Sequence, residues 1–190
     1  KGIVSSTPAS VNLALDAKGQ PISSTGNYKG KNVQILLRLK ELLPNLSIEQ
    51  LSGIVGNLKL ESGLNENITN SIGAYGLAQW LDRKKNLLLF ANANNLNFSD
   101  LDTQLRFIAE ELKTTEKKAF NMLQTASNPT SAAVIFRKFY ERPGESEARD
   151  DLRIKYSIEV YNDYGSKYAT AANDQQTTPK ATTTNTPSGK

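Results

Sequence analysis

Glu61 is the residue whose position in this sequence best suits acid–base chemistry. The segment before it carries four apolar residues, Leu51, Ile54, Val55 and Leu58. Their i, i+3, i+4, i+7 spacing predicts one buried stripe on a helix, and Glu61 is the next position on that stripe. A carboxyl group on a buried face loses hydration when it ionises, so its protonated form is favoured. Such a group suits a general acid, although most helical glutamates face solvent or pair with Lys or Arg.

The neighbouring residues predict where this helix begins and ends. Ser47 is followed three residues later by Gln50, a capping-box pattern in which two backbone donors at the helix start are satisfied. Gly63 is typical of a left-handed helix stop. Glu61 is therefore expected in the last turn, near the negative end of the helix dipole, which also disfavours its ionised form.

A second segment, residues 73–80, has the residue types that bind a sugar. It contains two glycines, an amide at Gln79 and the only tryptophan of the chain, Trp80. Glycines let the backbone approach a ligand closely. An indole ring can stack on the apolar face of a sugar while an amide binds its hydroxyl or acetamido groups. The alternative interpretation is a core tryptophan packed under a glycine-rich turn.

The chain resembles the phage tail lysozyme family in two segments, GIVGNLKLESGLN at 53–65 and GAYGLAQW at 73–80. These proteins are peptidoglycan-cleaving domains of the lysozyme superfamily, related in pattern to goose-type lysozymes and soluble lytic transglycosylases. The similarity extends over about Leu46 to Tyr164 and includes YERPG at 140–144. It implies a lysozyme-like fold and activity.

The resemblance also implies roles for individual residues. Glu61 would protonate the glycosidic oxygen between N-acetylmuramic acid and N-acetylglucosamine. By the same resemblance, the saccharide cleft would be lined by Gly76, Gln79 and Trp80. Tyr75 and Tyr140 are further candidates, although tyrosines in such positions are more often core residues.

Three carboxylates are candidates for a second catalytic group: Glu66, Asp82 and Glu141. A carboxylate about 5 Å from the acid implies retention through a covalent intermediate, and one at about 6.5–9.5 Å implies inversion by an activated water. Each of the three can also be a structural ion-pair partner. Without a second carboxylate, the acetamido group or 6-hydroxyl of the substrate completes the reaction. The 6-hydroxyl gives the 1,6-anhydro product of a lytic transglycosylase, and Tyr140 could assist that step.

The composition excludes several kinds of chemistry. The 190 residues include no cysteine and no histidine, which removes thiol nucleophiles, Ser-His-Asp triads and the usual zinc ligand sets. We expect no metal and no cofactor. A net charge of +4 favours anionic partners such as cell-wall polymers. The Lys and Arg residues are scattered, so we expect no nucleic-acid binding, and no apolar run is long enough for membrane insertion.

The apolar periodicity predicts a mainly α, lysozyme-like domain with at most a small β element. Helices are expected from about Asn32 to Leu43, Ile48 to the stop at Gly63, Asp82 to Ala91, Ser99 to Leu112, Glu116 to Ala126, Ser131 to Tyr140 and Glu147 to Tyr164. The polar loop at 64–72 is long enough to form the rim of a cleft. Glu110 and Glu111 are expected on the solvated face of their helix.

Three regions follow from this pattern. Residues 1–30 form an irregular N-terminal arm, residues 31–168 the catalytic domain, and residues 169–190 a disordered Thr/Pro-rich linker. A linker of this kind tethers a monomeric domain to other modules. The chain begins with Lys1 rather than Met, so we expect a mature form or an excised fragment. The expected location is extracellular, secreted or associated with the cell wall, or on a virion tail.

Two classes of function remain open from the sequence. The first is an enzyme that cleaves peptidoglycan strands, either a muramidase acting on the β-1,4 bond or a lytic transglycosylase. The second is a non-catalytic cell-wall-binding or structural tail module that has kept the cleft. The retained acid, glycines and Gln-Trp pair favour the enzyme.

Overall fold

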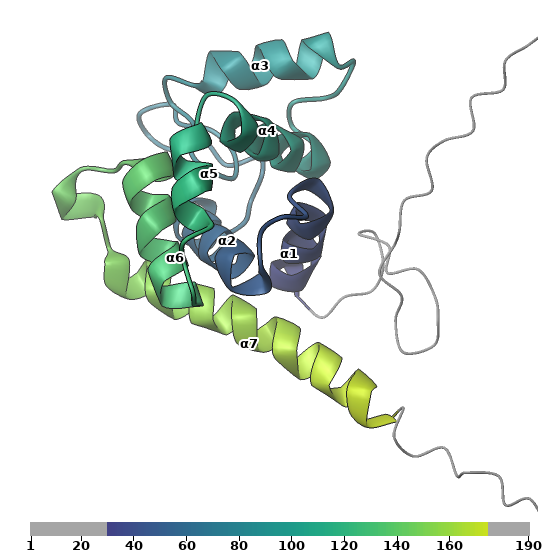
Figure 1. Ribbon diagram of the computed structural model, residues 1–190. Coiled ribbons are helices and arrows are strands. Elements are labelled where there is room, and N and C mark those ends of the chain that lie inside the picture. The colour runs from purple at the N-terminus through teal and green to yellow at the C-terminus, as the bar shows by residue number, and fades with distance from the viewer. Residues whose placement is uncertain (1–29, 175–190) are drawn as a thin grey trace, which may run out of the picture. The chain divides into compact units, whose positions relative to one another are not determined.

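The structure is a computed structural model that describes residues 30–174, with side chains described to residue 165 (Figure 1). The predicted N-terminal arm and most of the predicted C-terminal linker lie outside these residues. The residues that concern the site all belong to one compact unit, Ser24–Gly165.

The described residues form seven α-helices, one π-helix and one 3₁₀-helix. The helices are α1 Lys31–Leu42, α2 Ile48–Ser62, α3 Lys84–Ala93, α4 Leu101–Lys113, α5 Lys117–Leu123, α6 Pro129–Phe136, the π-helix η1 Arg137–Glu141, the 3₁₀-helix η2 Glu145–Glu147 and α7 Asp150–Asp174. Within this part of the chain there is no strand, and the β structure consists of two isolated bridges, Thr69 with Tyr75 and Tyr75 with Trp80. The predicted mainly α fold is confirmed.

Helix α2 lies at the centre of the fold and has the predicted ends. The Ser47 side chain accepts a hydrogen bond from the backbone N–H of Gln50, and the Gln50 side chain accepts one from the backbone N–H of Ser47. Gly63 ends the helix in the left-handed conformation, with φ of 60°. The predicted apolar stripe is fully buried. The local sequence therefore determines how α2 delivers Glu61 to its C-terminal turn.

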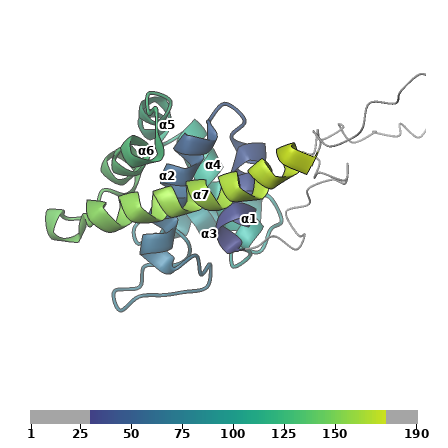
Figure 2. The same ribbon diagram turned by 90° about the horizontal axis from the view of Figure 1, so that it is seen from below.

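Two glycines of α2 let other helices approach its backbone. A Cβ atom on Gly53 would lie 2.4 Å from the Cβ of Ala132 in α6, and one on Gly56 would lie 2.1 Å from Oγ of Ser157 in α7. Neither distance is compatible with packed atoms. Helix α7 can therefore cross α2 directly, as Figure 2 shows, and it brings its first turns to the end of α2.

The other helices differ from their predictions mainly at their ends. Helix α6 begins at Pro129, before its predicted start at Ser131, and Asn128 caps it through Ser131 N. Helix α3 begins at Lys84 without a side-chain cap, after its predicted start at Asp82. Helix α7 begins at Asp150 and continues past its predicted end at Tyr164, through Gly165. A glycine inside a helix costs only about 1 kcal/mol, so it does not by itself end one.

Glu111 was predicted to face solvent, but it is buried. Glu110 is exposed as predicted, but Glu111 is only 3% exposed. The neighbouring positions Ile108 and Leu112 are both buried, and Glu111 continues their face of α4 into the core. Buried carboxylates require partners, and its partners come from distant parts of the chain.

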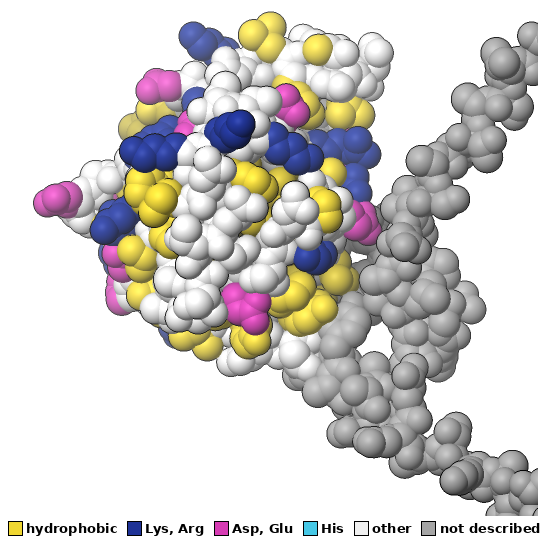
Figure 3. All heavy atoms as spheres, in the orientation of Figure 1, with side chains coloured by type: hydrophobic (Ala, Val, Ile, Leu, Met, Phe, Trp, Pro, Cys, Tyr) yellow, Lys and Arg dark blue, Asp and Glu magenta, His cyan; other side chains and the backbone are white. Residues whose placement is uncertain are grey.

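The surface is mixed in character. On the face shown in Figure 3, Lys and Arg side chains lie over α4 and α5 among uncharged ones. Within residues 30–174, none of the helices is both long and apolar enough to cross a membrane.

Candidate active site

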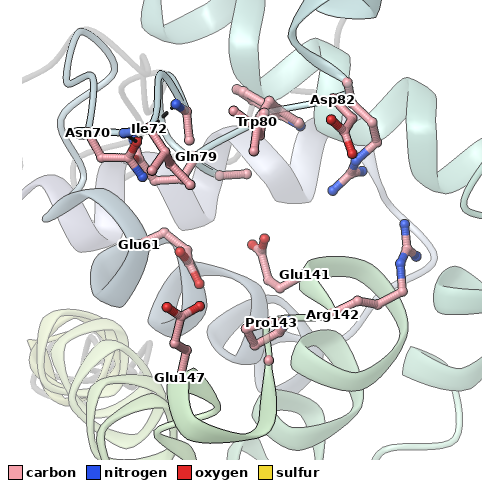
Figure 4. A pocket seen from close by; sticks show the side chains of 15 residues that line it. Glu61, Asn70, Ile72, Gln79, Trp80, Asp82, Glu141, Arg142, Pro143 and Glu147 are labelled. Atoms are coloured by element: carbon pink, nitrogen blue, oxygen red, sulfur yellow. Dashed lines mark hydrogen bonds between the residues drawn. The ribbon is translucent and has the colours of Figure 1, made fainter.

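A cleft of about 480 Å³ opens at the C-terminal end of α2 (Figure 4). One wall is the segment from Asn70 to Arg83, and the other is the segment from Glu141 to Glu147. Four carboxylates line it: Glu61, Asp82, Glu141 and Glu147. In Figure 4 the carboxyl groups of Glu61, Glu141 and Glu147 point into the space between the walls.

Glu61 lies in the last turn of α2, as predicted. Its side chain is 21% exposed, so the carboxyl group is half-buried but open to the cleft. Oε1 accepts a hydrogen bond of 2.7 Å from Nη2 of Arg153. The sequence named pairing with Lys or Arg as an alternative for this glutamate, and the partner in the structure is Arg153. Because Arg153 is 92 positions away, the helical pattern of α2 gave no sign of it.

Arg153 is itself almost completely buried, with 1% of its surface exposed. Its Nε donates to the backbone oxygen of Ala148 at 2.7 Å, and its Nη1 donates to Oδ1 of Asn57 at 2.8 Å. Asn57 is held in turn, because its amide donates to the backbone oxygens of Gly53 and Ala133. The guanidinium is therefore fixed from three sides with one edge toward Glu61.

Glu141 is the second carboxyl group deep in the cleft. Its Oε1 is buried and has no hydrogen-bond partner among the described residues. Burial, followed by the neighbouring charge of Glu61, raises the pKa of Glu141 well above its usual value. Both effects favour the protonated form of Glu141.

Tyr140 and Glu141 are adjacent residues of the π-helix η1, but they occupy different environments. A π-turn is rare and is often found at functional sites. Glu141 lines the cleft, whereas Tyr140 is fully buried and stacks on Phe136 with ring centroids 4.4 Å apart. Tyr140 was a candidate for the cleft wall, but it is not among the lining residues because its ring lies in the core.

Trp80 and Tyr140 meet at Glu111, beneath the cleft. Oε2 of Glu111 accepts hydrogen bonds from Nε1 of Trp80 at 3.1 Å, OH of Tyr140 at 2.5 Å and Nη1 of Arg83 at 3.0 Å. Burial raises the pKa of Glu111, against the opposing effects of Arg83 and the two other donors. This cluster fixes the wall that carries Asp82 and Arg83.

Trp80 does not offer a free ring face to a sugar. The residue is 1% exposed, and its ring packs edge-on against Phe107 with centroids 5.4 Å apart. Only a small part of it reaches the cleft lining. Its environment is that of a core tryptophan under a glycine-rich turn, the alternative that the sequence left open.

The glycine-rich turn is held from below by Gln104. Its Oε1 accepts from Leu77 N at 2.9 Å, and a Cβ on Gly76 would lie 2.5 Å from the same oxygen. Gly76 therefore serves packing, and neither it nor Tyr75, which is 8% exposed, lines the cleft. Gln79 does line it, with a left-handed φ of 46° and its Nε2 donating to Gly76 O at 2.9 Å.

The other candidate carboxylates occupy different environments. Asp82 is exposed on the cleft wall. Glu66 is not among the lining residues. It forms an ion pair of 2.5 Å with Lys31, which lowers the pKa of Glu66 against the effect of its burial. Glu147 was not predicted, because a glutamate in a short 3₁₀-helix has no sequence pattern that marks it.

Two exposed apolar side chains lie at the mouth of the cleft. Ile72 is 68% exposed and Leu81 is 46% exposed, and both belong to the wall formed by residues 70–83. Apolar surface beside hydrogen-bonding groups such as Asn70 and Gln79 is typical of carbohydrate sites. No group of three or more acidic residues in the described part of the chain has the arrangement of a metal site.

The arrangement combines an acid pair, polar groups and apolar lips in one open cleft, which suits cleavage of a glycosidic bond. A search among curated proteins found no match. The family model for phage tail lysozyme matches residues 34–164. This match covers more than half of the chain, including the cleft, and supports a lysozyme-like, peptidoglycan-degrading function: the chain belongs to the phage tail lysozyme family.

Proposed function

We propose that this protein is a muramidase, which hydrolyses the β-1,4 bond between N-acetylmuramic acid and N-acetylglucosamine with Glu61 as the general acid. The main support is the presence of two partly buried carboxyl groups, Glu61 and Glu141, in the same cleft, Glu61 bound to Arg153 and Glu141 with its buried Oε1 left without a hydrogen-bond partner among the described residues. Two carboxyl groups that face one space can supply the acid and the second group of a glycosidase.

Glu61 protonates the glycosidic oxygen as positive charge develops on the sugar ring. Its partial exposure lets a leaving-group oxygen reach it, and its position at the end of a rigid helix fixes its direction. The charge of Glu61 in turn favours the protonated form of Glu141.

Glu141 is the second catalytic group in this proposal. It is partly buried, faces the same space as Glu61, and has its pKa raised by burial and by the charge of Glu61. Glu66 is tied to Lys31 outside the cleft, and Asp82 is exposed to water. Once Glu61 has transferred its proton, Glu141 in its carboxylate form stabilises the oxocarbenium-like sugar or activates the attacking water.

The apolar contacts of the substrate come from Ile72 and Leu81 rather than from the ring of Trp80. Both side chains are exposed at the cleft mouth, where they can cover the apolar face of a sugar or an acetamido methyl group. Gln79 and Asn70 supply amide groups on the same wall. Trp80 supports this wall from behind.

The presence of a second carboxyl group favours hydrolysis over the transglycosylase reaction, which needs only the acid. The deciding experiment is digestion of purified peptidoglycan followed by mass spectrometry of the released muropeptides. Reducing ends are expected. A product lighter by one water would show the transglycosylase, and no released product, with no loss of turbidity, would show a binding module.

The proposed substrate is the glycan strand of bacterial peptidoglycan, met on the outside of a cell or from a virion tail. Exposed lysines at the α4–α5 junction, Lys113, Lys117 and Lys118, add positive charge outside the cleft. They favour approach to an anionic wall through long-range attraction that salt weakens. We propose that the domain acts as a monomer and is tethered through its C-terminal segment.

A further inference from the structure

We propose that Arg153 is a positioning residue for the catalytic acid. By binding Oε1 of Glu61 it leaves Oε2 to carry the proton, and it stabilises the carboxylate that forms when that proton is transferred. This inference rests on the proposed function of Glu61, and it assigns a role to a residue outside the cleft lining.

The first argument is the rigidity of the guanidinium. Nε is bound to Ala148 O and Nη1 to Asn57 Oδ1, so two of its three nitrogens are occupied by groups other than Glu61. Asn57 is fully buried and is fixed by two backbone carbonyls. Only Nη2 remains for Glu61, at 2.7 Å. Arg153 therefore cannot follow Glu61 to another rotamer, and Glu61 keeps its bond only in one orientation.

The second argument concerns the two oxygens of Glu61. Arg153 has only donors, so the oxygen that it binds must be an acceptor and cannot carry the proton in that direction. The carboxyl proton is consequently placed on Oε2. A general acid works only when its proton points at the reacting oxygen.

The third argument is charge. The other acidic side chains that line the cleft are Glu141 from η1, Glu147 from η2 and Asp82 from the wall formed by residues 70–83. Arg83 and Arg142 also line the cleft, but they form ion pairs with Glu111 and Glu116. Arg153 alone is bound to Glu61 among the described cations. When the proton leaves Glu61, this guanidinium offsets a charge that the acidic neighbours would oppose.

A purely structural ion pair is the competing interpretation, since Arg153 also joins α7 to α2. The two interpretations differ in the effect on pH dependence. Loss of a structural contact lowers activity at every pH. Loss of a cation beside Glu61 also favours the protonated form of the acid, so the alkaline limb of the activity profile moves upward.

The test compares Arg153→Met with Arg153→Lys and with wild type, using kcat and KM on a soluble glycan fragment across the pH range. For Arg153→Met we expect kcat to fall at least tenfold, KM to stay within about twofold, and the alkaline limb to move up by about one pH unit. Arg153→Lys keeps the charge but not the fork of donors. It should leave the limb in place while kcat still falls.

Arg137→Met is the matched control. Arg137 forms a two-bond ion pair with Asp150 at the start of α7, but it does not line the cleft. This variant should lose stability without moving the limb. The proposal is overturned if Arg153→Met leaves the limb at its wild-type pH, or if Arg137→Met moves it equally.

Arg153→Lys keeps the test decisive if Arg153→Met does not fold, because a folded Arg153→Lys with wild-type kcat would also overturn the proposal. Failure of the proposed function is a separate result. An inactive wild type, or a Glu61→Gln variant as active as wild type, would refute the role of Glu61 itself. Wild-type behaviour of the Arg153 variants beside an inactive Glu61→Gln would refute only the role of Arg153.

Discussion

Nε1 of Trp80 donates a hydrogen bond to Oε2 of Glu111 at 3.1 Å, and this bond joins the sugar-binding motif of the sequence to the centre of the core. Both side chains are almost completely buried. Trp80, which the sequence suggested as a ring for stacking on a sugar, is thus a buried residue that holds the cleft wall in place. Glu111 in turn gathers Arg83 and Tyr140, so one carboxylate connects both walls of the cleft.

We predict that Trp80 contributes mainly to stability. Trp80→Ala should lower the free energy of unfolding by about 3–5 kcal/mol, because it removes a large buried side chain. Trp80→Phe keeps most of the ring but leaves Glu111 without one donor, at a cost of about 1–3 kcal/mol. Denaturant unfolding measures both. An unchanged stability with weaker binding of a muropeptide would instead support the stacking role.

We predict that Glu61→Gln lowers activity about 10²- to 10⁴-fold, the usual contribution of a general acid. The amide keeps the shape and can still accept a bond from Arg153, but it cannot donate the required proton. Loss of the charged bond to a buried guanidinium should cost about 2–3 kcal/mol of stability. Turbidity loss on isolated cell walls measures activity, and circular dichroism shows whether the variant is folded. Substantial lysis by the folded variant would contradict the assignment.

We predict that the apolar lips of the cleft contribute to substrate binding. Ile72→Ser and Leu81→Ser should each raise KM for a soluble glycan several-fold with little change in kcat, because they remove contacts made in the ground state and the transition state alike. Leu89→Ser is a matched control. Leu89 is 66% exposed, close to the 68% of Ile72, but it lies on α3 outside the cleft lining. An equal effect of all three substitutions would argue against a specific contact.

We predict that the buried carboxyl of Glu141 makes stability depend on pH. Its pKa is raised in the folded chain, mainly by burial, above the ordinary 4.5. At a pH between the ordinary pKa and the raised pKa, Glu141 is protonated in the folded chain and ionised in the unfolded chain. Unfolding in this range therefore releases a proton. The contribution of Glu141 to stability is fully present at a pH below its ordinary pKa, and it is lost as the pH rises through its raised pKa in the folded chain.

Glu141→Gln tests this dependence, since the amide stays neutral at every pH. Thermal unfolding of wild type should show a melting temperature that falls across this window, and the variant should show a shallower fall. Parallel curves for the two proteins would mean that Glu141 does not hold the proton. Gln cannot act as a carboxylate, so the same variant should also lose activity under the proposed mechanism.

The helix that carries Glu61 could be predicted almost completely from the sequence. Ser47, Gln50 and Gly63 act on backbone groups within three or four residues, and the apolar stripe of α2 needs only a core to face. Such local interactions are the same in any compact fold. The π-helix and the start of α7 were not predicted, because the chain there is shaped by packing rather than by capping residues.

The sequence by itself determined the helical class of the fold, the chemistry available to a chain without histidine or cysteine, and the placement of Glu61 at the end of a buried stripe. Only the tertiary structure decided what surrounds that carboxyl group: Arg153 from α7, Glu141 from η1, and a tryptophan turned toward Glu111. These contacts join residues tens of positions apart. Burial and charge depend on such distant neighbours, whereas a sequence pattern reports only on near ones.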